Sequence, residues 1–180
     1  MTQDQIVGRI TNSLVPFSGS PLFENGKEDL YGPLWVFITL NISIAIFGYL
    51  CVSIDKMFED QEIEYKMEAS KIVKGYSLLM FYFVVIPLGL FLLLKLIYPE
   101  NPSYQKILAV YGYSFTIFIP TTFTFLIPIE VIRWLFLIIA GIVSLWILFK
   151  EMVMNGLEYL EESKIYMIAG LQGILHIIFI

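Results

Sequence analysis

Charged residues are scarce in this chain of 180 residues. Asp, Glu, Lys and Arg make up only 15% of it, whereas a typical soluble domain carries about 25%. The 11 basic and 16 acidic side chains are too few to cover the surface of a globule of this size. The formal net charge of −5 also contradicts the basic stripe of a nucleic-acid-binding protein. The composition therefore excludes a typical soluble enzyme, and we expect no nucleic acid among the partners.

Cysteine and histidine are each present once, as Cys51 and His176. One cysteine permits no internal disulfide, and the two residues together are too few for a zinc site. We expect Cys51 to be a small packing residue and His176, four residues after Gln172, to be a hydrogen-bonded packing residue. The chain also shows no nucleophile–base pair and no phosphate-binding loop. It predicts no catalytic residue, no metal site, no cofactor and no enzymatic activity.

Long apolar runs are what the chain has in abundance. Hydrophobic residues make up 58% of it, and the mean hydropathy is +0.77. A helix needs about 20 apolar residues to cross a bilayer. Five uncharged runs approach or exceed that length: 34–54, 75–94, 107–129, 134–149 and 165–180. None alternates apolar and polar residues as barrel strands do. The pattern predicts an all-α, polytopic membrane protein with five transmembrane helices, of which the short fifth either spans a thinned bilayer or is re-entrant.

These runs divide the chain into two parts. Residues 1–33 form a short polar arm, and residues 34–180 form the transmembrane domain. The charged connector at 55–74 is either a helical extension lying against the membrane surface or a solvated loop. Basic residues do not decide the orientation, because the two possible sides carry six and five of them.

A short motif, Asp-Leu-Tyr-Gly-Pro, stands directly before the first apolar run. Its proline suits the first turn of a helix, and its tyrosine suits the headgroup level of a bilayer. The motif is therefore either a helix entry with an interfacial anchor or a recognition segment. Its residues are Asp29, Leu30, Tyr31, Gly32 and Pro33.

The third run contains a second motif, Tyr111-Gly112-Tyr113, where a small residue lets helices approach closely. Prolines at 87, 120 and 128 are expected to kink their helices, with threonines at 116, 121, 122 and 124 supplying replacement hydrogen bonds. Broken helices are typical of transporters, but the runs contain almost no ionisable side chain, which disfavours an ion or proton pathway. We expect Glu130 and Arg133, in the turn before the fourth run, to neutralise each other at the interface.

Both motifs resemble those of the Yip family of Ypt/Rab-interacting proteins, also called YIPF proteins. The first lies within DLYGPLWVFITLNISIAI and the second within LAVYGYSFTIFIPTTFTFLIPIEVIRW. The order of tyrosine-glycine-tyrosine, two Ile-Pro pairs and the basic-Trp entry to the next span is most similar to the branch called YIPF one and two. The resemblance covers residues 29–180.

The resemblance implies a five-span protein of Golgi and ER–Golgi membranes with a cytosolic N-terminus and a lumenal C-terminus. It implies a non-enzymatic adaptor or scaffold in vesicle-mediated transport and Golgi organisation. Its implied partners are Rab GTPases, other Yip-family membrane proteins and membrane lipids. The matched motif residues imply a partner-binding role for Asp29, Leu30, Tyr31, Gly32, Pro33, Tyr111, Gly112 and Tyr113. The arm is shorter than in many members, and a small transporter, channel or lipid-handling protein is the alternative.

Overall fold

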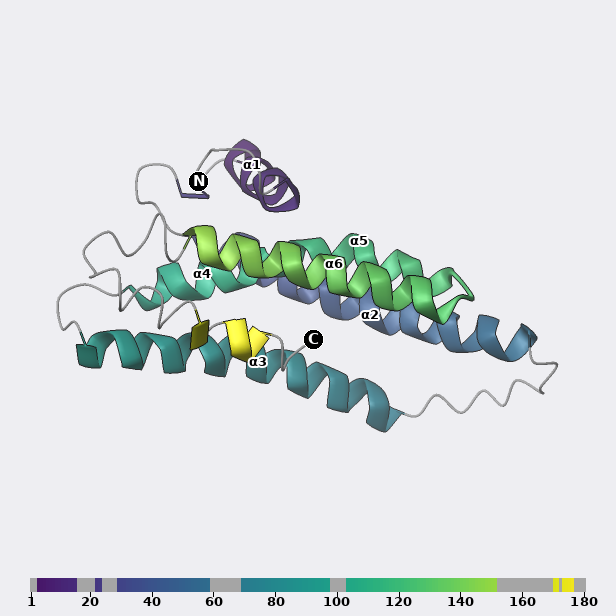
Figure 1. Ribbon diagram of the computed structural model, residues 1–180. Coiled ribbons are helices and arrows are strands. Elements are labelled where there is room, and N and C mark those ends of the chain that lie inside the picture. The colour runs from purple at the N-terminus through teal and green to yellow at the C-terminus, as the bar shows by residue number, and fades with distance from the viewer. Residues whose placement is uncertain are drawn as a thin grey trace.

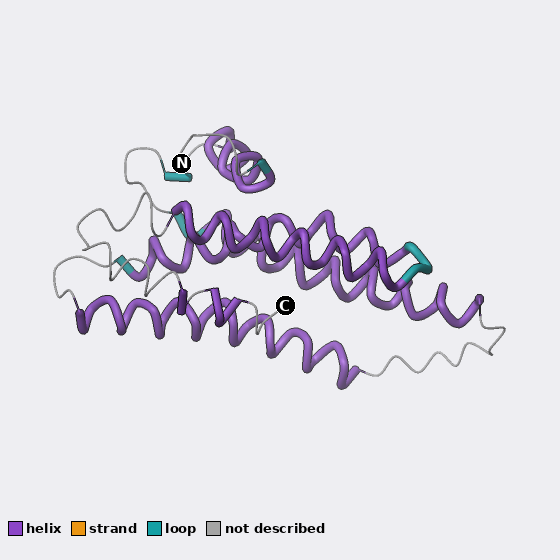
Figure 2. Tube along the Cα trace, in the orientation of Figure 1, coloured by secondary structure: helices purple, strands orange, loops and turns teal. Residues whose placement is uncertain are grey.

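The computed structural model describes residues 3–15, 22–23, 29–58, 69–97, 103–151, 170–171 and 173–176. All regular structure in these segments is helical (Figure 1 and Figure 2). Four helical stretches are long and apolar enough to cross a membrane: Tyr31–Ile54, Lys74–Leu96, Tyr104–Leu126 and Glu130–Phe149. The structure confirms the all-α polytopic fold class. The predicted fifth span lies largely outside the described residues, which include only short helical pieces of it at 170–171 and 173–176.

The two longest helices continue past their apolar runs into the charged connector. Helix α2 comprises Tyr31–Phe58, and α3 comprises Ala69–Ile97. Both ends of the connector are therefore helical: residues 55–58 belong to α2 and residues 69–74 belong to α3. The helical-extension interpretation expects this at both ends. The middle of the connector, 59–68, lies outside the described residues. Pro87 lies inside α3 without ending it.

The third span is broken into short pieces, unlike the single run predicted at 107–129. It consists of α4 (Tyr104–Ser114), η2 (Phe115–Ile117), α5 (Phe118–Thr121) and η3 (Thr122–Leu126). The breaks surround Pro120, which has no backbone N–H to donate. The hydroxyls of Thr121, Thr122 and Thr124 donate to carbonyls three or four residues earlier, at 2.7–2.9 Å. Three of the four threonines thus supply the local hydrogen bonds predicted for them, whereas the Thr116 hydroxyl is contacted by Ser13 of the arm.

The kink predicted at Pro128 is wrong. Helix η3 ends at Leu126, and Pro128 lies in the turn before α6 (Glu130–Phe149). The residue before α6, Ile129, is extended, with φ −130° and ψ 105°. Pro128 therefore separates two spans instead of bending one, because a proline readily fits the first residues of a turn.

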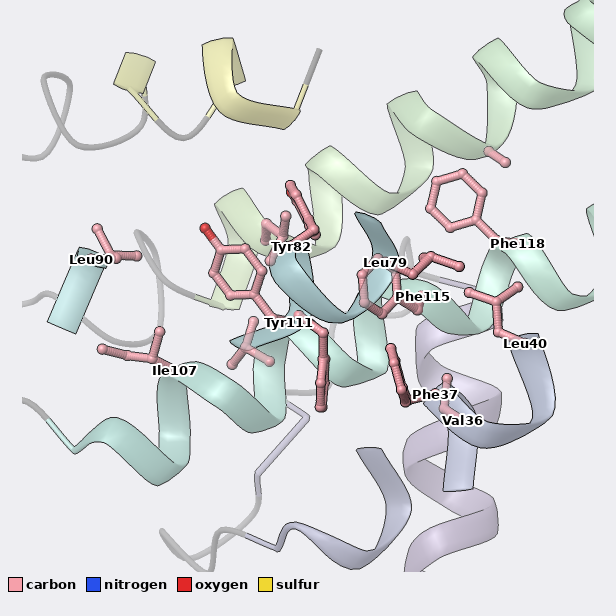
Figure 3. Close-up of a cluster of buried hydrophobic side chains, with 14 of the residues drawn as sticks. Val36, Phe37, Leu40, Leu79, Tyr82, Leu90, Ile107, Tyr111, Phe115 and Phe118 are labelled. Carbon is pink, nitrogen blue, oxygen red and sulfur yellow. The ribbon is translucent and has the colours of Figure 1, made fainter. Parts of the chain in front are cut away.

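The broken span is the centre of the bundle. In its most apolar stretch 67% of the residues are buried, whereas in the corresponding stretches of the other three spans only 11–33% are buried. Phe115 and Tyr111 lie among apolar side chains of α2 and α3, including Phe37 and Tyr82 (Figure 3). Large apolar side chains on the outer faces of α2, α3 and α6 are exposed, which suits contact with lipid.

The N-terminal arm contributes a helix that the sequence did not predict. Helix α1 (Gln3–Leu14) lies across the side of the bundle and contacts α4 and η2 (Figure 1). Arg9 and Ser13 on its inner face are buried, whereas Val7 on its outer face is exposed. The Ser13 hydroxyl lies 3.5 Å from the Thr116 hydroxyl of η2. The arm is therefore packed on the transmembrane helices over the described part of its length.

Thr122→Val should destabilise the protein by about 1 kcal/mol, because it removes one buried hydrogen bond beside the proline break. Thr39→Val is the matched control, since Thr39 lies on the exposed face of α2. Thermal unfolding in detergent of both variants and the parent would measure the difference. Equal melting temperatures for the two variants would contradict a stabilising role for the Thr122 hydroxyl.

Candidate functional site

Asp29 lies where the first motif meets the start of α2. Its Oδ1 atom accepts a hydrogen bond from the backbone N–H of Gly32 at 2.8 Å. The first N–H groups of a helix have no partner within the helix, and an aspartate just before it supplies one. The negative charge also lies favourably near the positive end of the helix dipole. Asp29 therefore starts α2, which is the helix-entry role that the sequence offered as one interpretation.

The second oxygen of Asp29 joins the two motifs. The Tyr113 hydroxyl donates to Oδ2 at 2.8 Å, and the Arg9 guanidinium of α1 forms an ion pair with the same atom. Both charged side chains are almost fully buried, with 10% of Arg9 and 7% of Asp29 exposed. A buried carboxylate is tolerated only when it is paired and hydrogen-bonded, and Asp29 meets both conditions. One side chain therefore connects α1, α2 and α4.

Two glycines make this meeting possible. A Cβ atom on Gly32 would lie 2.7 Å from Cζ of Tyr113, and one on Gly112 would lie 2.9 Å from Cα of Pro33. The added atom on Gly112 would also approach the Phe83 ring to 3.2 Å. The backbones of α2 and α4 therefore approach more closely than any larger residue permits at either position. This confirms the close approach that the small residue of the second motif predicts.

Aromatic rings enclose the buried ion pair. The Arg9 guanidinium lies 5.0 Å from the centroid of the Phe23 ring, and Phe23 meets Tyr113 edge to face at 6.1 Å. A cation over an aromatic face is attracted by the ring quadrupole, and the attraction grows where water is excluded. The backbone N–H of neighbouring Leu22 donates to Glu151 at 3.1 Å, so the arm also contacts the end of α6. Neither Arg9 nor Phe23 was predicted as a site residue.

The motif residues divide into an inward and an outward set. Gly32 and Pro33 are buried, as are all three residues of the second motif, where Tyr111 packs against Tyr82 of α3 at 5.9 Å. Leu30 and Tyr31 point outward, with 59% of Tyr31 exposed. The Tyr31 ring meets Trp35 edge to face at 6.0 Å, one helical turn further along α2. Only Leu30 and Tyr31 of the predicted partner-binding residues are thus available on the surface.

The remaining candidates of the sequence lie elsewhere. His176 is buried and shares a 2.6 Å hydrogen bond with the Tyr82 hydroxyl, which confirms it as a hydrogen-bonded packing residue. Glu130 accepts from the Trp134 indole N–H at 3.3 Å, and Arg133 donates through Nε to the Ile127 carbonyl at 2.7 Å. Cys51 is half-buried on α2. Among the described residues, no group of three or more His, Cys, Asp or Glu side chains could hold a metal.

The fold and this junction define a polytopic, all-helical membrane protein whose two sequence motifs interlock. The Yip1 domain family model matches residues 16–180, and the chain belongs to this family. The chain is also 30% identical over 142 residues to the protein YIPF1 homolog of Dictyostelium discoideum. That alignment covers 76% of this chain but only 38% of the relative, so the chain spans less than half of the relative's length. No solved structure matches the chain.

Gly112→Ala should destabilise the protein by about 1–3 kcal/mol, because the added methyl group must displace the Pro33 backbone. Gly48→Ala on α2 is the control, since a Cβ there meets nothing within 4 Å. Alanine favours a helix over glycine, so Gly48→Ala should be neutral or slightly stabilising. Thermal unfolding in detergent would compare them, and a Gly112→Ala protein as stable as the control would contradict the close approach of α2 and α4.

Proposed function

We propose that the chain is a non-enzymatic membrane adaptor in vesicle-mediated transport and Golgi organisation. It resides in Golgi and ER–Golgi membranes with its N-terminus in the cytosol and its C-terminus in the lumen. Its partners are Rab GTPases and other Yip-family membrane proteins. Membership of the Yip1 domain family supports this proposal, since the family resemblance carries these expectations.

The observation that carries the proposal is the outward set of the first motif. Leu30 and Tyr31 are exposed, although the residues on both sides of them are fixed in the buried junction. An exposed tyrosine on a rigid support loses little conformational freedom when a partner binds, and tyrosines are frequent among the residues that dominate binding energy. The junction therefore presents a preorganised contact surface beside the start of α2. In this proposal the buried motif residues hold that surface in position. They are Asp29, Gly32, Pro33, Tyr111, Gly112 and Tyr113.

The alternative is a small transporter, channel or lipid-handling protein. The broken third span supports this alternative less than it supports the adaptor. Three of its four threonine hydroxyls donate to carbonyls of the same segment, and its central residues are buried among aromatic rings. A transport site would aim such groups at a solute. Robust solute or lipid flux from liposomes containing the purified protein would favour this alternative over the adaptor.

Tyr31→Ala should reduce recovery of Rab GTPases in a pull-down about tenfold or more, because a dominant contact residue contributes about 1.4 kcal/mol or more. Tyr49→Ala is the matched control, since Tyr49 is an exposed tyrosine further along the same helix. Recovery is normalised to membrane-inserted protein. Equal recovery with wild type, Tyr31→Ala and Tyr49→Ala would remove Tyr31 from the contact surface and leave the motif as a helix entry.

Five spans from a cytosolic N-terminus place the connector at 55–74 and the C-terminus in the lumen. Protease added to sealed vesicles should then remove an N-terminal tag and spare a C-terminal one. Detergent should expose both tags, which controls for vesicle integrity. Cleavage of both tags without detergent would mean an even number of spans, and residues 165–180 would then not cross the bilayer.

A further inference from the structure

The inner face of α1 carries the charge of this helix. Arg9 and Ser13 are buried against the bundle, where Arg9 pairs with Asp29 and the Ser13 hydroxyl lies 3.5 Å from that of Thr116. Arg9 is the only ionisable side chain of residues 5–15. The outer face of this part of α1 therefore carries no charge.

The outer face of α1 is instead apolar. Val7 and Leu14 are exposed, and so is Val15, which directly follows the helix. Thr11 lies between them at helical spacing, so these residues share one side of the helix. A helix on a water-facing surface turns its charged side chains outward and its apolar ones inward. Helix α1 places its charge inward and three apolar side chains outward, which indicates that its outer face meets an apolar environment.

The third span gives a scale for the depth of α1, because it runs alongside α2 in the same direction. The Tyr113 hydroxyl bonds to Asp29, just before α2 begins, and the Phe123 ring lies 4.4 Å from the Phe47 ring further along both. Thr116 is three residues beyond Tyr113, so it lies about 5 Å further into the span. It is inside the candidate membrane span Tyr104–Leu126.

These contacts fix the depth and direction of α1. Arg9 lies beside Asp29, level with the start of the apolar stretch of α2, and Ser13 lies beside Thr116, within the apolar part of the bundle. The helix lies across the bundle, so its axis follows the plane of the bilayer (Figure 1). Interfacial helices lie in that plane with their apolar face about 5–10 Å into the boundary between headgroups and acyl chains. Helix α1 has this direction and this depth.

We propose that α1 is an interfacial membrane helix whose outer face contacts the lipid acyl chains of the leaflet at which α2 begins. Lipid is the occupant that fits, because the first turn of α2 also exposes apolar side chains at this level, Leu34 and Trp35. A protein partner would meet a polar rim around an apolar centre, and the described outer face of α1 offers no charge for one. The inference goes beyond the adaptor function: this part of the arm binds the bilayer and is not a free tail.

Fluorescence quenching of the full chain in vesicles tests this depth. Val7→Cys and Val15→Cys, each in a Cys51→Ser background, carry an environment-sensitive fluorophore. The quenchers are a lipid with a nitroxide near its headgroup, a lipid with a nitroxide near its chain end, and iodide on both sides of the membrane. We expect the headgroup-proximal nitroxide to quench both labels several-fold more than iodide does, and more than the chain-end nitroxide does.

Two references calibrate the quenching. Ile139→Cys, an exposed position in the middle of the α6 stretch, should be quenched most by the chain-end nitroxide. The same fluorophore attached to glutathione shows the quenching by iodide that a label in water receives.

Three results would overturn the proposal. Iodide quenching of the Val7 and Val15 labels as strong as that of the glutathione adduct would mean that the arm faces water. Strongest quenching by the chain-end nitroxide, as at Ile139, would place α1 too deep for an interfacial helix. Protection from all three quenchers would mean that a second copy or another protein covers the outer face instead of lipid.

Discussion

The carboxylate of Asp29 is the constraint on which the start of the membrane domain depends. It accepts from the first turn of α2, from Tyr113 of α4 and from Arg9 of α1 at once. A buried charge that loses a partner costs about 3–5 kcal/mol, so each partner is held in place by the needs of the others. The junction thus fixes three helices from distant parts of the chain with one side chain.

The geometry around that carboxylate explains why the two motifs have the residues they do. Tyr113 reaches Asp29 only because Gly32 leaves room for its ring, and Pro33 reaches α4 only because Gly112 has no side chain. Each motif therefore supplies one glycine that accommodates a bulky residue of the other. The same contacts set the axial position of α3, since Phe83 lies against Gly112 beside Pro33. The junction, the close approach of α2 and α4, and the contact of α3 with Gly112 are consequences of one packing arrangement.

The sequence was sufficient for the fold class because long uncharged runs have few solutions other than membrane helices. It also located both motifs and the close approach at Gly112. It could not predict Arg9 as a partner of Asp29, since the two residues are 20 positions apart and only the packing of α1 on the bundle brings them together. Pro120 predicted that the third span is interrupted. The boundaries of its pieces were not predicted, because they depend on which carbonyls accept hydrogen bonds from the threonine hydroxyls. The contact of Phe83 of α3 with Gly112 depends on tertiary packing, which hydropathy does not encode.

Hydrogen exchange in an Asp29→Asn variant tests the central role of the carboxylate most directly. Asparagine keeps an oxygen for the Gly32 N–H but cannot pair with the Arg9 charge, so α2 should keep its start while α1 loses its anchor. Amides of Gln3–Leu14 should then exchange at least about tenfold faster than in the wild type, the ratio that corresponds to about 1.4 kcal/mol, whereas amides of Glu130–Phe149 should be unchanged. Unchanged exchange in α1, or equal acceleration in α1 and α6, would contradict the account.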